Sequence, residues 1–512
     1  MLSTHPTICV SVCESDWSSV AAAVSKVGTQ EALVEIRLDC LESDVLENLD
    51  RLRKLLAATT LPTIVTFRSA AEGGRCAADY ETRLRFWRDE GLQLASSFVD
   101  LELDIAEQLL REGNEIEWSR VICSYHNPAE ITGDLNQVFE RLAATPARVM
   151  KIAVRINDAE DCLPIFELLD RGKHAGREII AIGMGPAGVA TRILGPSRGA
   201  CLTYASLETA RATAAGQISF AELTNVYRLA KITRATAITG LVGSPVGHSI
   251  SPQIHNAAFA SLGADAVYIP FDVRDLKAFF KRMVHPQTRE IDWHMRGLSI
   301  TAPHKTAVLA ELDWIEPGAR EIGAVNTVVV ENERLCGYNT DANAFIEPLK
   351  NRLGPLSDCR VAILGAGGAA SAALYSLKQE NAATTIFARD SKKGKQLADR
   401  WSCEWRELPD AVFAEFDLVI NTTPLGTKGP QEKETAADAR QLRGARLAYD
   451  LVYNPGMTRF LNEARAAGCE TLDGLPMLLS QAAQQIQLWT GQAADSDVMR
   501  TAATRALRNS IS

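Results

Sequence analysis

Residues 148–154, Arg-Val-Met-Lys-Ile-Ala-Val, form an apolar run with the composition of a fully buried β-strand, interrupted by one lysine. Removing an ammonium group from water is costly, so a lysine inside such a strand usually has a chemical role. Burial favours the neutral amine, which can attack a ketone and form a Schiff base. The alternative is a structural lysine whose side chain reaches water or a carboxylate at the strand end. We therefore predict a strand here and treat Lys151 as a candidate nucleophile.

Seven more β-rich runs accompany this one at intervals of about 25–30 residues, the spacing of βα units. The eight predicted strands span residues 8–13, 33–39, 63–69, 98–103, 120–126, 148–154, 178–184 and 200–205. Amphipathic segments lie between them, for example 45–57, 81–94 and 134–143. Eight such units in about 230 residues are typical of a closed (β/α)8 barrel. An open doubly wound sheet is the alternative.

Polar residues gather where these strands end, which in a barrel is where chemistry takes place. Glu35 and Arg37 are two residues apart, so both side chains face the barrel interior. The other strand ends contribute Arg68, Ser124, His126, the turn 184–188 and, on the following helix, Arg192. Each could be part of a structural salt bridge, but together they favour a compact anionic ligand with a reactive carbonyl.

A second α/β unit begins with the strand predicted at residues 237–242. Further on, the predicted strand 360–364 continues directly into Gly-Ala-Gly-Gly-Ala-Ala and a helix, a dinucleotide-binding pattern in which glycines let a pyrophosphate approach the helix N-terminus. Alone, the glycine turn could be only a tight connection. The next strand ends at Arg389, with Lys392 and Lys393 nearby, which favours the 2′-phosphate of NADP over NAD. Asp390 is the competing signal, because it could bind a ribose hydroxyl.

Four polar turns of the second half combine hydroxyl, amide, cationic and carboxylate groups, as a polyhydroxylated acid would require. They span residues 244–252, 301–305, 324–327 and 339–341. Each alone could be a helix cap or a turn. Together they suggest Lys305 as the general acid for a carbonyl oxygen, with Asp341 holding it charged and in place.

Composition restricts the class of protein. The 512 residues are 46% apolar and 23% charged, which predicts two or three soluble globular domains. The net charge of −9 argues against nucleic acid or an anionic membrane as partner. The eleven cysteines show no CxxC spacing and suggest free thiols in a reducing compartment. With a strand predicted almost at once and no signal or transit pattern before it, we expect a cytoplasmic protein. We predict no metal site and leave the oligomeric state open.

The first half resembles type I 3-dehydroquinate dehydratase across residues 7–230. The motifs are EIRLD (35–39), TFRS and EGG (66–69, 72–74), SYH (124–126), KIAV (151–154), MGxxG (184–188) with Arg192, and AAGQIS (214–219). The resemblance implies that Lys151 forms an imine with the substrate, that His126 moves protons and that Glu35 orients His126. It implies further that the substrate is bound by Arg37, Arg68, Arg192, Thr213 and Gln217.

The second half resembles shikimate dehydrogenase across residues 237–505. The motifs are SPVGHSISPQIHN (244–256), LSITAPHK (298–305), GAVNT (323–327), NTD (339–341), GAGGAA (365–370), INTTPLG (420–426), YDLVYNPGMTRFL (449–461) and DGLPMLLSQAA (473–483). The resemblance implies that Lys305 and Asp341 are the catalytic pair. Substrate contacts would come from Ser249, Ser251, Thr301, Asn326 and Gln481. Contacts to NADP would come from Gly365, Ala366, Gly367, Gly368, Ala369, Arg389, Lys393, Thr423, Tyr453 and Gly474.

Together, the two resemblances imply consecutive reactions: dehydration of 3-dehydroquinate to 3-dehydroshikimate, then reduction to shikimate by NADPH. The whole chain thus resembles the bifunctional family that joins these activities. We expect a barrel at 1–232 and a dehydrogenase at 233–512, in which 237–342 and about 478–510 bind substrate and 343–477 form a Rossmann-type domain. The alternatives are a quinate/shikimate dehydrogenase with broader substrate use in the second half, or a ligand sensor that has lost catalysis.

Overall fold

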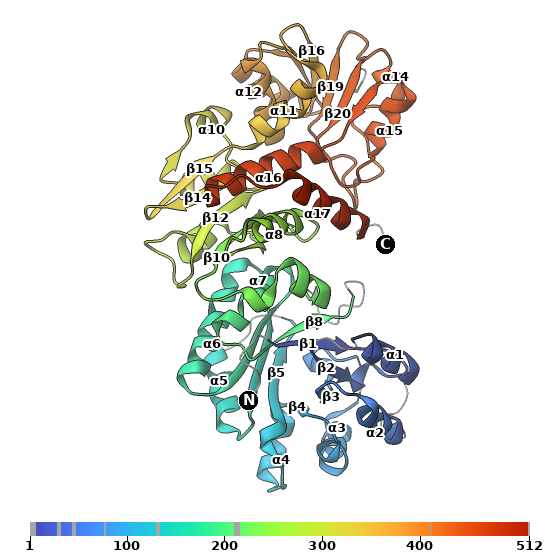
Figure 1. Ribbon diagram of the computed structural model, residues 1–512, viewed down its shortest axis with the longest axis vertical. Helices are drawn as coiled ribbons and strands as arrows, with labels where there is room; N and C mark the ends of the chain where they lie inside the picture. Colours follow the sequence, from blue (N-terminus) through green and yellow to red (C-terminus); the bar gives the residue numbers. More distant parts are fainter. Residues whose placement is uncertain are drawn as a thin grey trace.

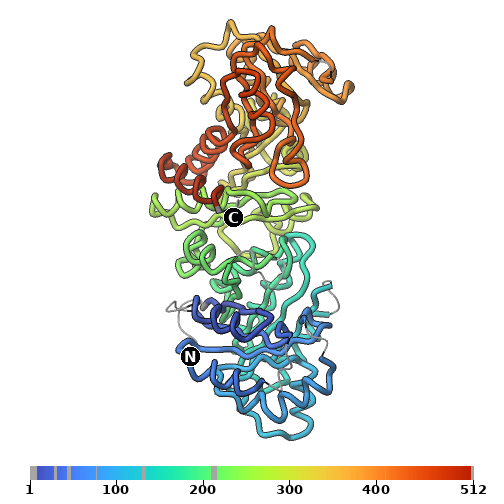
Figure 2. Tube along the Cα trace, turned by 90° about the vertical axis from the view of Figure 1, so that its right-hand side faces the viewer, coloured from blue at the N-terminus to red at the C-terminus, as the bar shows by residue number. Residues whose placement is uncertain are grey.

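The chain is an elongated α/β molecule with three parts stacked along its long axis, the barrel at one end and the dinucleotide-type sheet at the other (Figures 1 and 2). The structure is a computed structural model and describes residues 7–27, 32–42, 48–75, 78–129, 134–208, 216–409 and 411–509. Among the helices described, none has both the length and the apolar character needed to cross a membrane.

The N-terminal part is a closed parallel barrel. Its strands are β1 (Thr7–Val12), β2 (Ala32–Arg37), β3 (Thr63–Thr66), β4 (Phe98–Glu102), β5 (Val121–Asn127), β6 (Val149–Arg155), β7 (Glu178–Met184) and β8 (Leu202–Ser206). They pair in the order β7-β6-β5-β4-β3-β2-β1-β8, and a parallel bridge from Ile179 of β7 to Ala200, just before β8, closes the ring. A two-residue strand, β9 (Ile218–Ser219), pairs with β8. The barrel prediction is confirmed, and the open sheet is excluded.

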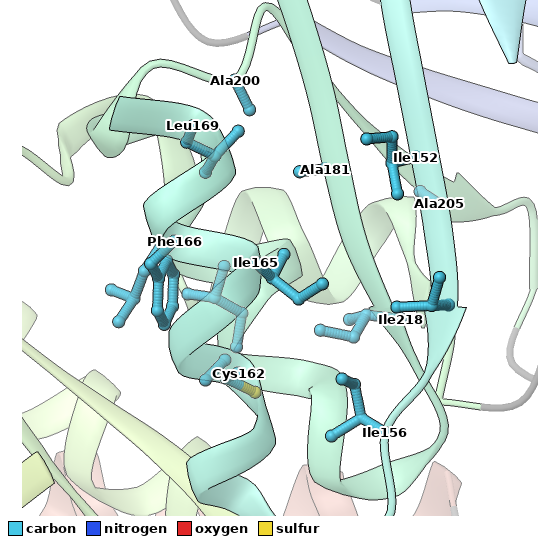
Figure 3. Packing of buried hydrophobic residues seen from close by; sticks show 14 of the residues in the cluster. Ile152, Ile156, Cys162, Ile165, Phe166, Leu169, Ala181, Ala200, Ala205 and Ile218 are labelled. Carbon is cyan, nitrogen blue, oxygen red and sulfur yellow. The ribbon is translucent and has the colours of Figure 1, made fainter. Parts of the chain in front are cut away.

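Helices cover the outside of this barrel. They are α1 (Trp17–Val27), α2 (Leu49–Ala58), α3 (Tyr80–Asp89), α4 (Leu103–Arg111), α5 (Leu135–Ala144), α6 (Leu163–His174) and α7 (Val189–Leu194). Alternation along β6 sends Ile152 outward, into the apolar layer that also contains Ile165 and Leu169 of α6 (Figure 3). Val149 and Ala153 face the opposite way, into the interior cluster. Lys151 shares their parity, so the same alternation directs it into the barrel.

The middle part is a mixed six-stranded sheet in the order β11-β10-β12-β14-β15-β13. Its strands are β10 (Ala237–Gly243), β11 (Ala266–Asp272), β12 (Met295–Ile300), β13 (Trp314–Ile315), β14 (Thr327–Glu331) and β15 (Arg334–Tyr338). Its helices are α8 (Ser251–Leu262), α9 (Leu276–Phe279), α10 (Pro317–Ile322) and α11 (Asp341–Leu353). The C-terminal helices α16 (Leu475–Thr490) and α17 (Ser496–Asn509) return to this part and pack against α8 (Figure 1).

The third part is a parallel six-stranded sheet in the order β18-β17-β16-β19-β20-β21, the 3-2-1-4-5-6 order of a Rossmann fold. Its strands are β16 (Arg360–Leu364), β17 (Ala383–Ala388), β18 (Glu404–Glu407), β19 (Leu418–Asn421), β20 (Leu447–Asp450) and β21 (Glu470–Leu472). Its helices are α12 (Gly368–Gln379), α13 (Ser391–Trp401), α14 (Ala439–Leu442) and α15 (Arg459–Ala466). The predicted fold class is therefore confirmed for both halves.

The barrel and the middle sheet share a packed junction. Helix α7 lies against β11, and one continuous cluster of buried apolar side chains includes Ala190 and Ile193 from α7 together with Ile269 and Phe271 from β11. Figure 1 shows α7 at this junction. The two halves are thus held by a common core, and not by a linker alone.

The expectation of free thiols is wrong for two cysteines. Cys13 and Cys40 form a disulfide with their Cα atoms 5.3 Å apart. They follow the neighbouring strands β1 and β2, and the parallel pairing of these strands brings the two residues together although 27 positions separate them. A pairing between distant positions leaves no spacing pattern in the sequence.

Candidate active sites

A cavity of about 170 Å³ opens among the strand ends of the barrel. Charged and polar side chains from five strands, and from segments that follow strands, line it: Ser11, Glu35, Arg37, Arg68, Glu72, His126, Lys151, Arg155, Arg192, Tyr204 and Gln217. The predicted barrel residues are therefore brought together, except Thr213, which lies outside the described residues. The size of the cavity suits a small, compact ligand.

Lys151 is buried at the bottom of this cluster. Its Nζ lies 2.8 Å from Asp100 Oδ2 and 3.5 Å from Glu35 Oε1, and it sits 4.1 Å from the centre of the Tyr204 ring. Burial alone would raise the pKa of Asp100, but Arg68 and Lys151 hold that pKa well below its usual range. Lys151 is thus paired with an ionised carboxylate at the resting site. The sequence predicted a neutral amine, whereas the nearest charged neighbours of Lys151 are the anions Asp100 and Glu35.

His126 is positioned by Glu72, and not by Glu35 as the family resemblance suggested. Its ring Nδ1 and its backbone N–H both lie 3.1 Å from Glu72 Oε2. Glu35 instead accepts hydrogen bonds from Ser11 (2.6 Å) and Thr66 (2.9 Å), on the Lys151 side of the cavity. Burial, with the nearby cations Arg68 and Lys151, lowers the pKa of His126 well below its usual value. His126 is therefore a neutral base at neutral pH, while burial raises the pKa of Glu72 to about 7.

Four arginines line the cavity, and three of them are the residues predicted to bind the substrate. Arg68 is buried and donates to Asp100 and Ser124, both at 2.8 Å. Arg37 holds Asp39 in a bidentate pair at 2.7 and 2.8 Å. Arg192 is only 2% exposed, and its Nε has no hydrogen-bond partner among the described residues. Burial lowers the pKa of Arg192 to about 10. An unpaired buried guanidinium is costly, so Arg192 is suited to bind an anionic ligand group.

Sequence reasoning missed Asp100, and it quoted Glu72 only as part of a motif. Asp100 carried a usable signal, since it is a carboxylate in the middle of the short strand β4, between apolar neighbours, as Lys151 is a cation between apolar neighbours in β6. Glu72 carried no such signal, because it lies in a short 3-10 helix after β3 and meets His126 only through tertiary contact.

The second site lies in the second half of the chain, at the start of α11. Lys305 Nζ is 2.5 Å from Asp341 Oδ2, as the predicted pair requires. Asn326 Nδ2 donates to the other oxygen, Asp341 Oδ1, at 2.8 Å, and lies 3.4 Å from Gln481 Oε1. Four of the predicted residues thus form one hydrogen-bonded group drawn from two loops and the helices α11 and α16.

The serine loop after β10 contributes further hydroxyl groups. Ser249 Oγ donates to Ser251 Oγ at 3.1 Å. Tyr453, predicted as a cofactor contact, lies beside Ser249, and burial raises the pKa of its hydroxyl. Thr301 follows β12, where its N–H donates to Val242 at 2.9 Å. The loop of Ser249 and Ser251 follows β10, and Thr301 and Lys305 both follow β12. The hydroxyl groups are thus gathered at the same end of the sheet as Lys305.

The turn between β16 and α12 fits a dinucleotide. Gly365 has φ of +117°, and a Cβ there would lie 2.7 Å from Thr422 Oγ1, so a side chain is excluded. A Cβ at Gly367 or Gly368 would meet nothing within 4 Å, which leaves room for a phosphate at the N-terminus of α12. Thr423 is fixed nearby by Asn421, to whose Oδ1 its hydroxyl donates at 2.6 Å.

The structure settles the position of Asp390. Its side chain caps α13 by accepting the N–H of Lys393 at 3.1 Å. Asp390 therefore has a structural role, while Arg389 and Lys393 are exposed after β17, where a 2′-phosphate would lie. Gly474 is the N-cap residue of α16, and a Cβ there would lie 2.3 Å from the Leu451 carbonyl oxygen.

Comparisons with known proteins match both halves. Residues 8–234 match the family model of type I 3-dehydroquinase, 241–328 that of the shikimate dehydrogenase substrate-binding domain, and 474–504 that of the shikimate 5′-dehydrogenase C-terminal domain. The chain is 31% identical over 514 residues to the chloroplastic bifunctional 3-dehydroquinate dehydratase/shikimate dehydrogenase of Arabidopsis thaliana, covering 96% of this chain and 83% of that protein. It is 37% identical over 284 residues to the NADP(+) shikimate dehydrogenase of Caldanaerobacter subterraneus, covering 52% of this chain and 96% of that enzyme. A solved Thermus thermophilus shikimate 5-dehydrogenase, in complex with NADP(H) and shikimate, is 36% identical over 53% of this chain and 99% of its own, with a TM-score of 0.48.

Proposed function

Since this chain belongs to the family of bifunctional 3-dehydroquinate dehydratase/shikimate dehydrogenases, we propose that it catalyses both reactions in sequence. The barrel converts 3-dehydroquinate to 3-dehydroshikimate, and the second half reduces that product to shikimate with NADPH. The observation that carries the proposal is that each half has its own complete reactive group: Lys151 with His126 in one cavity, and Lys305 with Asp341 in the other half.

In the barrel, Lys151 acts as the nucleophile. It transfers a proton to Glu35, whose Oε1 lies 3.5 Å from Nζ, its amine adds to the substrate ketone, and loss of water gives a protonated imine. The positive charge on the imine nitrogen then makes the adjacent C–H bond more acidic. Asp100, 2.8 Å from Nζ, supports this step because it stabilises the positive charge while the bond forms.

His126 performs the elimination. As a neutral base it removes the proton from the carbon next to the imine. The hydroxyl one carbon further leaves as water and takes the proton from His126. Hydrolysis of the imine then releases the enone and restores Lys151. Arg37, Arg68, Arg192 and Gln217 hold the carboxylate and hydroxyls, and the free Nε of Arg192 favours the carboxylate for that residue.

In the second half, Lys305 protonates the ketone oxygen as charge develops on it, and Asp341 keeps the ammonium oriented. Bound NADPH supplies the hydride. Ser249, Ser251, Thr301, Asn326 and Gln481 bind the hydroxyls and carboxylate of the substrate. Gly365, Gly367 and Gly368 admit the pyrophosphate, and Arg389 with Lys393 pairs the 2′-phosphate. Small molecules are thus the partners of both sites, and the cytoplasm is the compartment that we propose.

A cross-complementation experiment tests this assignment. Lys151→Ala should lose dehydration but still reduce 3-dehydroshikimate, and Lys305→Ala should lose reduction but still produce 3-dehydroshikimate from 3-dehydroquinate. Mixing the two purified variants should restore conversion of 3-dehydroquinate to shikimate. A Lys151→Ala protein that still dehydrates, or a Lys305→Ala protein that loses both steps, would show that the two sites are assigned wrongly.

A further inference from the structure

Asp158 joins the dehydratase half to the dehydrogenase half. It follows β6, the strand of Lys151, by three residues, and its Oδ1 caps the short helix Ala159–Cys162 by accepting the N–H of Ala159 at 2.8 Å. The same carboxylate accepts two backbone N–H groups from the other half. The N–H of Arg274 lies 3.0 Å from both oxygens, and the N–H of Asp275 lies 2.7 Å from Oδ2.

The segment bound by Asp158 also contacts both loops of the dehydrogenase substrate site. Val273, fully buried, donates its N–H to Gly243 at 2.9 Å, where the loop to Ser249 and Ser251 begins. Its carbonyl oxygen accepts a hydrogen bond from His304 Nε2 at 2.7 Å. His304, only 6% exposed, directly precedes Lys305 in the chain.

These contacts form an unbroken path from the barrel to Lys305. The carboxylate fixes the backbone at positions 274 and 275, that backbone fixes the carbonyl of Val273, and the carbonyl fixes the ring of His304. Lys305 must keep its Nζ 2.5 Å from Asp341, so a shift of the His304 main chain is transmitted to the reacting ammonium. A misplacement of about 1 Å can cost on the order of a hundredfold in rate.

We propose that Asp158 is a positioning residue for the dehydrogenase reaction, although it belongs to the dehydratase barrel. The inference rests on the proposed function, since it assigns Lys305 the role of proton donor. The proposal gives the junction a function beyond joining the two halves. The loop that follows β6, the strand of Lys151, helps to position Lys305 in the second active site.

The variant that separates the two roles of Asp158 is Asp158→Ser. Serine is a good helix cap, so the hydroxyl can still accept the N–H of Ala159, but it is too short to bridge to positions 274 and 275. We expect kcat for reduction of 3-dehydroshikimate to fall about 3- to 30-fold, with the KM for NADPH unchanged. With NADPH deuterated at the transferred position, the isotope effect on kcat should increase, because hydride transfer becomes more rate-limiting. Asp158→Asn, which keeps an acceptor of the same reach, should recover most of kcat.

The matched control is Arg198→Met. Arg198 donates from Nη2 to the carbonyl oxygen of Asp292 at 2.7 Å, another contact across the junction, and Asp292 lies before β12, outside the hydrogen-bonded path that leads from Asp158 to His304. This variant should keep the wild-type kcat for reduction. An equal fall in both variants would mean general loosening of the junction and would overturn the proposal, as would a wild-type kcat in Asp158→Ser. Thermal unfolding and dehydratase activity verify folding, and Asp158→Thr replaces the serine variant if that one does not fold. If the wild-type protein itself does not reduce 3-dehydroshikimate, the proposed function fails instead.

Discussion

The Lys305–Asp341 pair offers the sharpest prediction for the reductase step. Asp341→Asn keeps the shape of the side chain and its bond with Asn326, but it removes the charge that faces Lys305 at 2.5 Å. The two side chains are 26% and 10% exposed, so water screens the attraction only in part. For such pairs an effective dielectric constant of about 20 gives an attraction of about 4 kcal/mol at 4 Å.

Without this attraction, Lys305 should be a poorer proton donor, and the rate of reduction should fall. Positioned general acids typically contribute about 10²- to 10⁴-fold, which corresponds to about 2.7–5.5 kcal/mol in the activation barrier. We therefore expect kcat for reduction to fall by this factor in Asp341→Asn and in Lys305→Ala, with substrate affinity reduced less than turnover. Because both residues act on one proton, the double variant should be little worse than the more damaged single variant.

The assay follows NADPH oxidation with 3-dehydroshikimate as substrate, for the wild type, both single variants and the double variant. Dehydration of 3-dehydroquinate serves as the internal control and should continue in all four proteins. If the two single effects multiply in the double variant, the residues do not act as a unit, and the dyad is wrong.

The remaining predictions concern the barrel and the cofactor. Borohydride added with 3-dehydroquinate should attach the substrate covalently to Lys151, as peptide mass spectrometry would show, and an adduct on another residue would exclude the imine. His126→Ala should lower dehydration by about 10²- to 10⁴-fold, and unchanged turnover would leave His126 without a role in proton transfer. Burial, Arg68 and Lys151 keep the pKa of His126 well below 6.5, so the neutral form of His126 should persist below pH 6.5 and be lost only as the pH falls through the lowered pKa. An inflection near pH 7 in kcat/KM is therefore assigned to Glu72. This inflection should disappear in the Glu72→Gln variant. Arg389→Ala should raise the KM for NADPH far more than the KM for NADH. The factor should correspond to about 1.5–3 kcal/mol, the free energy of one charge-assisted hydrogen bond. An equal rise of the two KM values would contradict a contact between Arg389 and the 2′-phosphate.

The sequence predicted the barrel because its signals are local. Each strand is a short apolar run, and alternation along β6 assigns Lys151 to the interior without any tertiary information. The same holds for Gly365, whose place between a strand and a helix predicted the dinucleotide turn together with the basic residues that follow the next strand.

Contacts between distant loops were beyond this reasoning. His126 was predicted as a proton shuttle, but its partner is Glu72, 54 positions away, and not Glu35, which serves Ser11 and Thr66. The Cys13–Cys40 disulfide depends likewise on the pairing of two strands. Asp390 was ambiguous because a residue after a strand can bind a ligand or cap the next helix, and only the hydrogen bond to Lys393 shows which.

The central claim is that one chain performs two consecutive reactions, and the most direct measurement is the stoichiometry of the purified wild-type protein. With 3-dehydroquinate alone, the absorbance of the enone should appear and persist. With NADPH added, one NADPH should be oxidised for each 3-dehydroquinate consumed, and mass spectrometry should identify shikimate as the product. Formation of the enone without NADPH oxidation, or oxidation of NADPH by 3-dehydroquinate with no dehydration, would contradict the account.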